Sequence, residues 1–166
     1  MLPAGLRLVI FDADDTLRRT TVAGKPCPHA PGEWELLPRV REMLSAVDWM
    51  RGSVRIGVAS NQDQVAYGHL THAMAHRLLR DMLVEATGCP TLDAVIELCP
   101  HALDVPCDCR KPAPGMLLRA MAAAGVTPAE TLFVGDAPTD AEAARRAGVA
   151  FTWAADFFGR SGGPRS

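Results

Sequence analysis

Residues 6–16 read Leu-Arg-Leu-Val-Ile-Phe-Asp-Ala-Asp-Asp-Thr, an apolar run that ends in three carboxylates and a hydroxyl. A strand this apolar is expected to lie inside a sheet, so that its last residues open at the rim. Acidic side chains there are unfavourable unless a cation or a reaction uses them. Asp12 and Asp14 alternate, so one carboxyl group can attack as a nucleophile while the other carries a proton, with a hard cation between them.

Apolar runs and helical spacings alternate along the rest of the chain. We predict strands at 6–12, 54–60, 93–98, 131–135 and 149–153. We predict helices at 38–50, at 63–87 with a possible break at Gly68, at 115–124 and at 139–147. Residues 18–34 contain Pro and Gly and indicate a loop or short flap. The alternation predicts an α/β fold, with a doubly wound, mainly parallel, five-stranded (Rossmann-like) sheet and helices on both faces.

Length and charge limit the possible functions. The chain has 166 residues, of which 48% are apolar, and a formal net charge of −2. We expect a single domain over residues 1–158 and a flexible tail over 159–166, which is rich in Gly, Ser and Arg. The charge argues against non-specific binding to nucleic acid or membrane surfaces. Neither a membrane-spanning run nor a signal peptide is evident, so we expect a cytoplasmic protein. The sequence does not indicate the oligomeric state, and we take a monomer as the default.

Further polar residues follow the predicted strands or precede helices. These are Ser60 with Asn61, Lys111, and Asp136 with Asp140. Each has a simpler alternative, since Ser60 or Asp136 could only cap a helix and Lys111 could only be solvated. Their order along the chain, each at a strand or loop end, favours convergence on one site.

Together with the Asp12–Thr16 segment, these residues resemble the haloacid dehalogenase superfamily of phosphotransferases, over Val9 to about Gly148. The resemblance implies that Asp12 attacks phosphorus and forms an aspartyl-phosphate. Asp14 would protonate the leaving alcohol and then activate water. Lys111 and the Ser60 hydroxyl would stabilise the transition state.

The resemblance also implies a catalytic Mg²⁺, because a phosphomonoester is negative and repels an attacking carboxylate. The ion would be held by the carboxylates of Asp12 and Asp136 and by the backbone carbonyl of Asp14.

A second cluster lies in the loop that precedes Lys111. Cys99 and His101, followed by Cys107 and Cys109, form a closed Cys₃His set suited to a structural Zn²⁺. A zinc ion bound by these four residues would hold the loop together (a zinc-stapled loop) and would stiffen it just before Arg110. The alternative is an accidental cluster of buried thiols beside a surface His. Disulfides are disfavoured in a cytosolic setting.

The zinc loop followed by Arg110-Lys111-Pro112 narrows the resemblance to a capless branch that holds heptose bisphosphate and histidinol-phosphate phosphatases. This implies a substrate-recognising role for Arg110 and no large cap domain. Other candidate substrate contacts are Thr16, Arg18, Arg19 and Asn61.

Two positions depart from the family pattern. Asp15 stands where the family usually has Gly, and Ala137 stands where the heptose enzymes typically have a Lys that contacts substrate. The loop over residues 17–21 also differs from that of the heptose enzymes. The resemblance therefore supports the phosphatase chemistry more strongly than it supports heptose as the substrate.

The sequence thus predicts a Mg²⁺-dependent phosphomonoesterase for a small phosphorylated metabolite, either a sugar phosphate resembling heptose bisphosphate or histidinol phosphate. One alternative is a polynucleotide 3′-phosphatase, although that function needs a basic groove which the net charge does not support. The other is a non-catalytic, zinc-stabilised binding module, for which Asp15 is the only hint.

Overall fold

Five parallel strands form the centre of the molecule in the computed structural model, which describes residues 2–161. They are β1 (Leu8–Phe11), β4 (Arg55–Asn61), β5 (Val95–Cys99), β6 (Thr131–Gly135) and β7 (Ala150–Trp153). Their order across the sheet is β5-β4-β1-β6-β7, so the chain starts in the middle and winds outward in both directions. This confirms the predicted doubly wound sheet.

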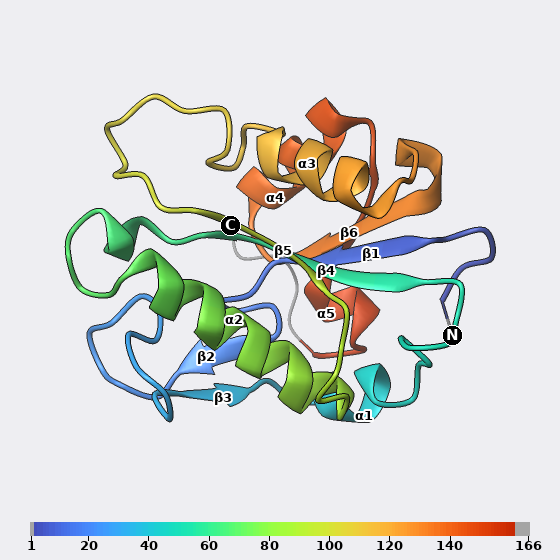
Figure 1. Ribbon diagram of the computed structural model, residues 1–166, viewed down its shortest axis with the longest axis horizontal. Helices are drawn as coiled ribbons and strands as arrows, with labels where there is room; N and C mark the ends of the chain where they lie inside the picture. The colour runs from blue at the N-terminus through green and yellow to red at the C-terminus, as the bar shows by residue number, and fades with distance from the viewer. Residues whose placement is uncertain (1, 162–166) are drawn as a thin grey trace.

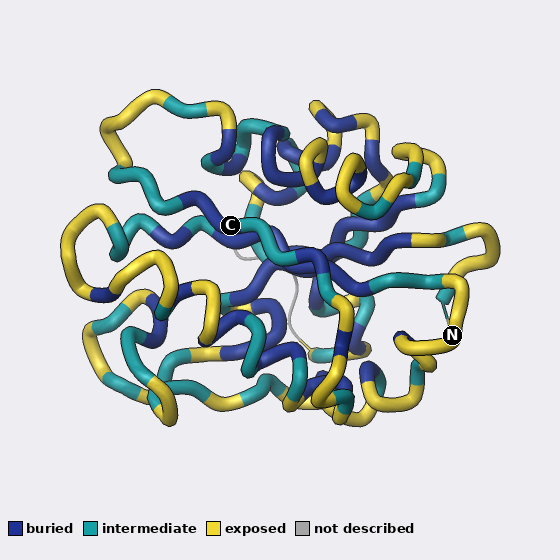
Figure 2. Tube along the Cα trace, viewed as in Figure 1, coloured by how far each residue is buried: buried dark blue, intermediate teal, exposed yellow. Residues whose placement is uncertain are grey.

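Helices cover both faces of this sheet (Figure 1). One face carries α3 (Gly115–Ala124) and α4 (Pro138–Ala147), and the other carries α1 (Val40–Leu44), α2 (His72–Thr87) and α5 (Ala154–Phe157). Short 3₁₀ turns span Asp63–Val65 and Pro128–Glu130. Each face has its own apolar core, and the central strands are the most deeply buried part of the chain (Figure 2).

The segment after β1 forms a small antiparallel hairpin, β2 (Arg18–Thr20) and β3 (Trp34–Leu36), where a loop or short flap was predicted. Its connecting loop lies at the same end of the molecule as the loop after β5 and the segment before α2 (Figure 1). Side-chain contacts join these segments, since His29 stacks on His69 and the Tyr67 hydroxyl accepts the Leu103 N–H. The described residues contain no inserted cap domain.

The prediction of a helix over 38–50 was wrong beyond Leu44. The Trp49 indole N–H donates to the Leu44 carbonyl at 2.7 Å, and Asp48 accepts the backbone N–H groups of Met50 and Arg51. These contacts replace helical hydrogen bonds with turns. The predicted break at Gly68 is confirmed, since Gly68 has a φ of 78° and α2 starts afresh after its N-cap, Thr71.

The end of the described chain folds back onto the domain. Arg160 donates to the carbonyl oxygens of Pro38 at 3.0 Å and Thr16 at 2.9 Å, so residues 159 and 160 of the predicted tail are attached to the domain. Residues 162–166 of that tail lie outside the described residues. Within residues 2–161, we find no helix of the length and apolarity that crossing a bilayer requires.

Candidate active site and metal centre

The strand register brings the predicted polar residues to one edge. β1 pairs with β4 on one side and with β6 on the other, with Phe11 opposite both Val58 and Val134. Asp12 and Asp136 therefore follow β1 and β6, and Ser60 lies near the end of the neighbouring β4, all at the carboxyl end of the sheet, where α/β folds bind ligands. Lys111 reaches the same place from the loop between β5 and α3.

Lys111 lies at the centre of this group. Its ammonium donates to Asp12 Oδ1 at 2.7 Å, Asp140 Oδ1 at 2.7 Å and the Ala59 carbonyl at 2.9 Å, so all three of its N–H groups are used. Burial alone would lower the pKa of Lys111, but the carboxylates of Asp12 and Asp140 outweigh burial and raise it. Lys111 is therefore a fixed positive charge beside the Asp12 carboxylate.

Asp12 and Asp136 face each other across the hydroxyl of Thr16, which lies 3.2 Å from a carboxylate oxygen of each. Burial, together with neighbouring carboxylates, raises the pKa of both Asp12 and Asp136. Since ionised carboxylates placed this close repel one another, a cation between them would be strongly favoured. An all-oxygen donor set of this kind fits a hard divalent ion such as Mg²⁺.

Asp140 completes the acidic group, and its ligand oxygens lie within 4.8 Å of those of Asp12 and Asp136. Both Asp140 oxygens are already engaged, one by Lys111 and the other by the backbone N–H groups of Asp136 and Ala137 at 3.1 and 3.0 Å. A Cβ on Gly135 would lie only 2.5 Å from the Asp140 carboxylate, which requires glycine there. Asp140 thus positions the Asp136 loop, leaving Asp12 and Asp136 to face a cation.

Asp14 is held by two buried donors. Arg18 Nε donates to its Oδ1 at 2.9 Å, and Gln62 Nε2 donates to its Oδ2 at 2.9 Å. The same Gln62 nitrogen lies 2.8 Å from Ser60 Oγ. Arg18, Ser60 and Gln62 are each only 1% exposed.

The remaining candidates for substrate contact lie in different settings. Thr16 has no exposed surface, and Arg19 is an exposed residue of the hairpin that pairs with Glu35. The Asn61 side-chain amide makes two hydrogen bonds with the backbone of Lys111. Its Oδ1 accepts the Lys111 N–H at 3.0 Å, and its Nδ2 donates to the Lys111 carbonyl at 3.3 Å. Arg110 is mostly buried, and its nearest carboxylate oxygen is Asp63 Oδ1, 3.9 Å away.

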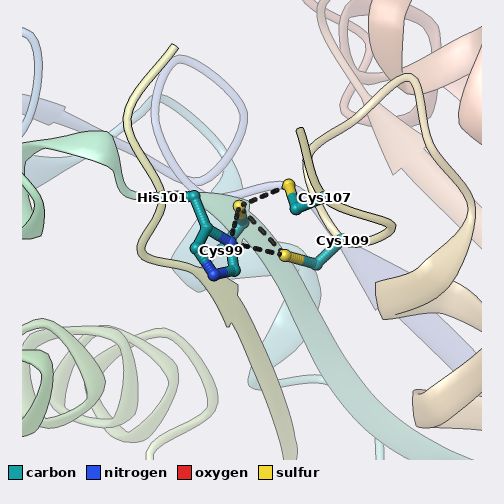
Figure 3. A group of neighbouring side chains, drawn as sticks. All are labelled: Cys99, His101, Cys107 and Cys109. Carbon is teal, nitrogen blue, oxygen red and sulfur yellow. Dashed lines mark hydrogen bonds between the residues drawn. The ribbon is translucent and has the colours of Figure 1, made fainter. Parts of the chain in front are cut away.

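The four predicted zinc ligands converge (Figure 3). Cys99 Sγ lies 3.1 Å from Cys109 Sγ and 3.7 Å from Cys107 Sγ, and His101 Nδ1 lies 3.4 and 3.1 Å from the Sγ atoms of Cys99 and Cys109. A tetrahedral ion with Zn–S bonds of about 2.3 Å holds its sulfurs about 3.8 Å apart, so modest spreading of this set would accommodate Zn²⁺. The chemistry of the donors fits a closed structural site.

The backbone also links the two clusters. The Arg110 N–H donates to Cys107 Sγ at 3.3 Å; burial opposes ionisation of this thiol, but that contact and the neighbouring thiols lower its pKa to about 7. Cys99 ends β5 directly opposite Asn61. The thiol cluster therefore adjoins Arg110, which precedes Lys111, and Asn61, which hydrogen-bonds the Lys111 backbone.

Sequence reasoning missed the contribution of Gln62. It directly follows Ser60 and Asn61, but an amide residue before a helix carries no signal that its side chain turns back to a carboxylate. Asp140 was noticed only for its spacing from Asp136, and its ion pair with Lys111 depends on the tertiary fold.

Comparison with known proteins places this geometry in a family context. A sequence model described as haloacid dehalogenase-like hydrolase matches residues 26–148, a range that contains Lys111 and Asp136 and begins after Asp14. The D-glycero-beta-D-manno-heptose-1,7-bisphosphate 7-phosphatase of Pseudomonas aeruginosa is 37% identical over 116 residues, which are 68% of this chain and 62% of that protein. The chain thus spans less than two thirds of that relative.

Two further matches extend over more of the chain. The enzyme of the same name from Bordetella bronchiseptica is 32% identical over 155 residues, 87% of this chain and 78% of that protein. The crystal structure of a D,D-heptose 1,7-bisphosphate phosphatase from B. bronchiseptica, complexed with magnesium and phosphate, superposes with a TM-score of 0.73 at 28% identity. That superposition covers 97% of this chain and 89% of the other.

Proposed function

Because the chain belongs to the haloacid dehalogenase-like hydrolases, we propose that it is a Mg²⁺-dependent phosphatase of small phosphorylated sugars. The observation that carries the proposal is the buried Asp12 carboxylate, which lies 2.7 Å from Lys111 and shares Thr16 with Asp136. A nucleophile, a fixed cation and an oxygen donor set for a metal thus meet at one point. A helix cap or a solvated turn would need none of these contacts.

In this proposal Asp12 attacks the phosphorus atom, its oxygen forms a new bond, and the alcohol oxygen leaves. Asp14 gives that alcohol its proton and later takes one from the water that hydrolyses the aspartyl-phosphate. Lys111 and Ser60 stabilise the charge on the transferring phosphoryl oxygens. A Mg²⁺ ion held by Asp12, Asp136 and the Asp14 carbonyl would offset the repulsion between carboxylate and phosphate.

We also propose that Cys99, His101, Cys107 and Cys109 hold a structural Zn²⁺. Four protein donors leave no open position for substrate, so the ion would act on the loop and not on the reaction. Its effect on catalysis would be to fix the backbone that carries Arg110 and Lys111.

The substrate class is proposed from the relatives, which are heptose bisphosphate phosphatases by name. Arg110 is a candidate to hold a second anionic group, but Asp63 Oδ1 lies 3.9 Å from it and Ala137 offers no charge. We therefore expect sugar monophosphates to be hydrolysed at least as well as bisphosphates. A screen of both groups by phosphate release tests this expectation.

The phosphatase proposal is tested with p-nitrophenyl phosphate in the presence of Mg²⁺. Asp12→Asn removes the nucleophile with almost no change in shape, so we expect activity to fall by about 10⁴-fold or more while the thermal unfolding curve is retained. Wild-type protein that releases no phosphate from any of a broad panel of esters would contradict the proposal and favour a binding module.

The same panel should include 3′-phosphorylated DNA. A preference for that substrate over sugar phosphates would favour the polynucleotide 3′-phosphatase alternative.

A further inference from the structure

We propose that Gln62 and Arg18 form a clamp that positions Asp14 for proton transfer, and that Gln62 also orients the Ser60 hydroxyl. This inference rests on the proposed phosphatase function. The clamp is defined by four side chains. Asp14 lies in the loop after β1, Arg18 begins β2, Ser60 lies near the end of β4 and Gln62 directly follows β4.

The contacts leave Asp14 little freedom. Its two oxygens accept from opposite partners, Arg18 Nε on one side and Gln62 Nε2 on the other, both at 2.9 Å. The donors are each 1% exposed, whereas the Asp14 side chain keeps 20% of its surface open. The carboxyl group is therefore fixed by buried donors while part of its surface stays accessible.

The chemistry of the neighbours fixes the orientation of the Gln62 amide. Its nitrogen faces the Asp14 carboxylate and the Ser60 oxygen, whereas the flipped amide would place an oxygen against that carboxylate. In the observed orientation Gln62 Oε1 is buried without a hydrogen-bond partner among the described residues. An unpaired buried carbonyl oxygen is unfavourable, so packing alone does not account for Gln62.

Gln62 also decides what Ser60 can do. Because the amide donates to Ser60 Oγ at 2.8 Å, the hydroxyl accepts from Gln62 and keeps its own hydrogen to donate. A hydroxyl held in this way can donate to a phosphoryl oxygen. Gln62 thus couples the proton-transfer residue to a candidate for phosphoryl stabilisation without touching the substrate itself.

Positioning of a proton donor has a specific kinetic signature. When an alcohol leaves, the departing oxygen needs the proton of Asp14, whereas p-nitrophenolate leaves readily without one. A residue that acts through Asp14 therefore matters much more for benzyl phosphate than for the similarly sized p-nitrophenyl phosphate. A residue needed only for folding or substrate binding affects both esters alike.

The experiment compares kcat/KM for these two esters in the wild type, Asp14→Asn, Gln62→Met and Gln62→Glu, with Mg²⁺ present. Gln62→Met keeps the length of the side chain but removes its hydrogen-bond donors. Gln62→Glu keeps the shape of the glutamine side chain and is the second variant, used if Gln62→Met does not fold. We expect either Gln62 variant to lose about 100-fold on benzyl phosphate and about tenfold or less on p-nitrophenyl phosphate, in the same direction as Asp14→Asn.

The matched control is Asn61→Ala, next to Gln62 on the same strand end. Asn61 bonds the backbone of Lys111 and makes no hydrogen bond to Asp14, so its loss should be equal for the two esters. Arg18→Lys keeps the positive charge but has a single donor group. This variant should also lose more activity on benzyl phosphate than on p-nitrophenyl phosphate, but by a smaller factor than the Gln62 variants.

Equal losses on both esters in the Gln62 variants, or no loss at all, would overturn the clamp. That result differs from a failure of the proposed function, in which the wild type itself would hydrolyse neither ester.

Discussion

Two polar clusters lie at the same end of this sheet, but the fold holds them in different ways. In the carboxylate cluster, Lys111 uses all three of its N–H groups on Asp12, Asp140 and the Ala59 carbonyl. Asp12 directly follows β1, Asp140 lies in the first turn of α4 and Ala59 lies within β4. In the thiol cluster, three of the four side chains come from the loop after β5, and the contacts are mainly among themselves. The first cluster is held by contacts with strands and helices of the fold, whereas we propose that the second depends on a bound ion to hold its loop.

Among the variants that test this difference between the two clusters, Lys111→Ala should have the largest effect on stability and activity. The substitution leaves the buried carboxylates of Asp12 and Asp140 without their cation, so we expect a loss of stability of about 3–5 kcal/mol. Phosphatase activity should fall by at least about 100-fold, because a fixed charge beside the nucleophile is lost. Urea unfolding and phosphate release measure the two effects.

The control for Lys111 is Arg119→Ala, which breaks exposed ion pairs with Glu97 and Asp108. Its expected loss of stability is at most about 1 kcal/mol. If the Lys111 variant lost no more stability than this control, the carboxylate cluster would not be the preformed, internally paired unit described above.

A comparable loss of stability, but without loss of a group at the reaction site, is expected when the proposed zinc is removed from the thiol cluster. With free zinc at about 1,000 times its dissociation constant, the bound ion stabilises the folded state by about 4 kcal/mol, which strong chelation or Cys109→Ser should abolish. Elemental analysis should find about one zinc per chain in untagged protein, and none in the variant.

Limited proteolysis locates that change. Loss of zinc should expose residues 100–110 to cleavage first. The control is Cys89→Ser, since Cys89 lies outside the cluster, and this variant should change neither the zinc content nor the cleavage pattern. Freshly purified wild type without zinc would break the comparison, since the loop would then be ordered by protein contacts alone.

The smallest effect is expected at Asp15, which the resemblance to the family marks as a departure from the usual pattern. Asp15 has a φ of 64°, in the left-handed region that glycine adopts freely. Asp15→Gly should therefore stabilise the protein by up to about 1 kcal/mol. It also removes one of the negative charges around Asp136.

Arg39→Gly is a matched control for Asp15, because Arg39 has a φ of 67° at the start of α1. Both variants should raise the midpoint of thermal unfolding slightly, but only Asp15→Gly should change the Mg²⁺ concentration needed for half-maximal activity. An equal metal requirement in both variants would show that the Asp15 carboxylate has no influence on the cation site.

The sequence predicted the sheet well because the strand signals are strong. β1 is a continuous apolar run and β6 has the apolar centre Leu-Phe-Val. Gly125 and Gly148 end α3 and α4 with positive φ, as expected for helix C-caps. The helix over 38–50 failed beyond Leu44 because side-chain contacts of Asp48 and Trp49 decided the local backbone. Periodicity in the sequence carries no information about such contacts.

The candidate site was predictable only in part. Because parallel strands end at a common edge, the convergence of Asp12 and Asp136 followed from the strand assignment. The direction in which polar side chains turn did not follow. Asn61 was predicted to contact substrate, and the sequence did not show that its side chain also hydrogen-bonds the Lys111 backbone. The role of Gln62 followed only from its contact with Asp14 in the folded structure.

A crystal structure of the protein with Mg²⁺ and beryllofluoride tests the central claim, that Asp12 accepts the phosphoryl group, most directly. The expected result is a beryllofluoride adduct on an Asp12 oxygen, with Mg²⁺ bound by Asp12, Asp136 and the carbonyl of Asp14. An unmodified Asp12 and no cation between these carboxylates, under conditions in which the crystal diffracts well, would contradict the account.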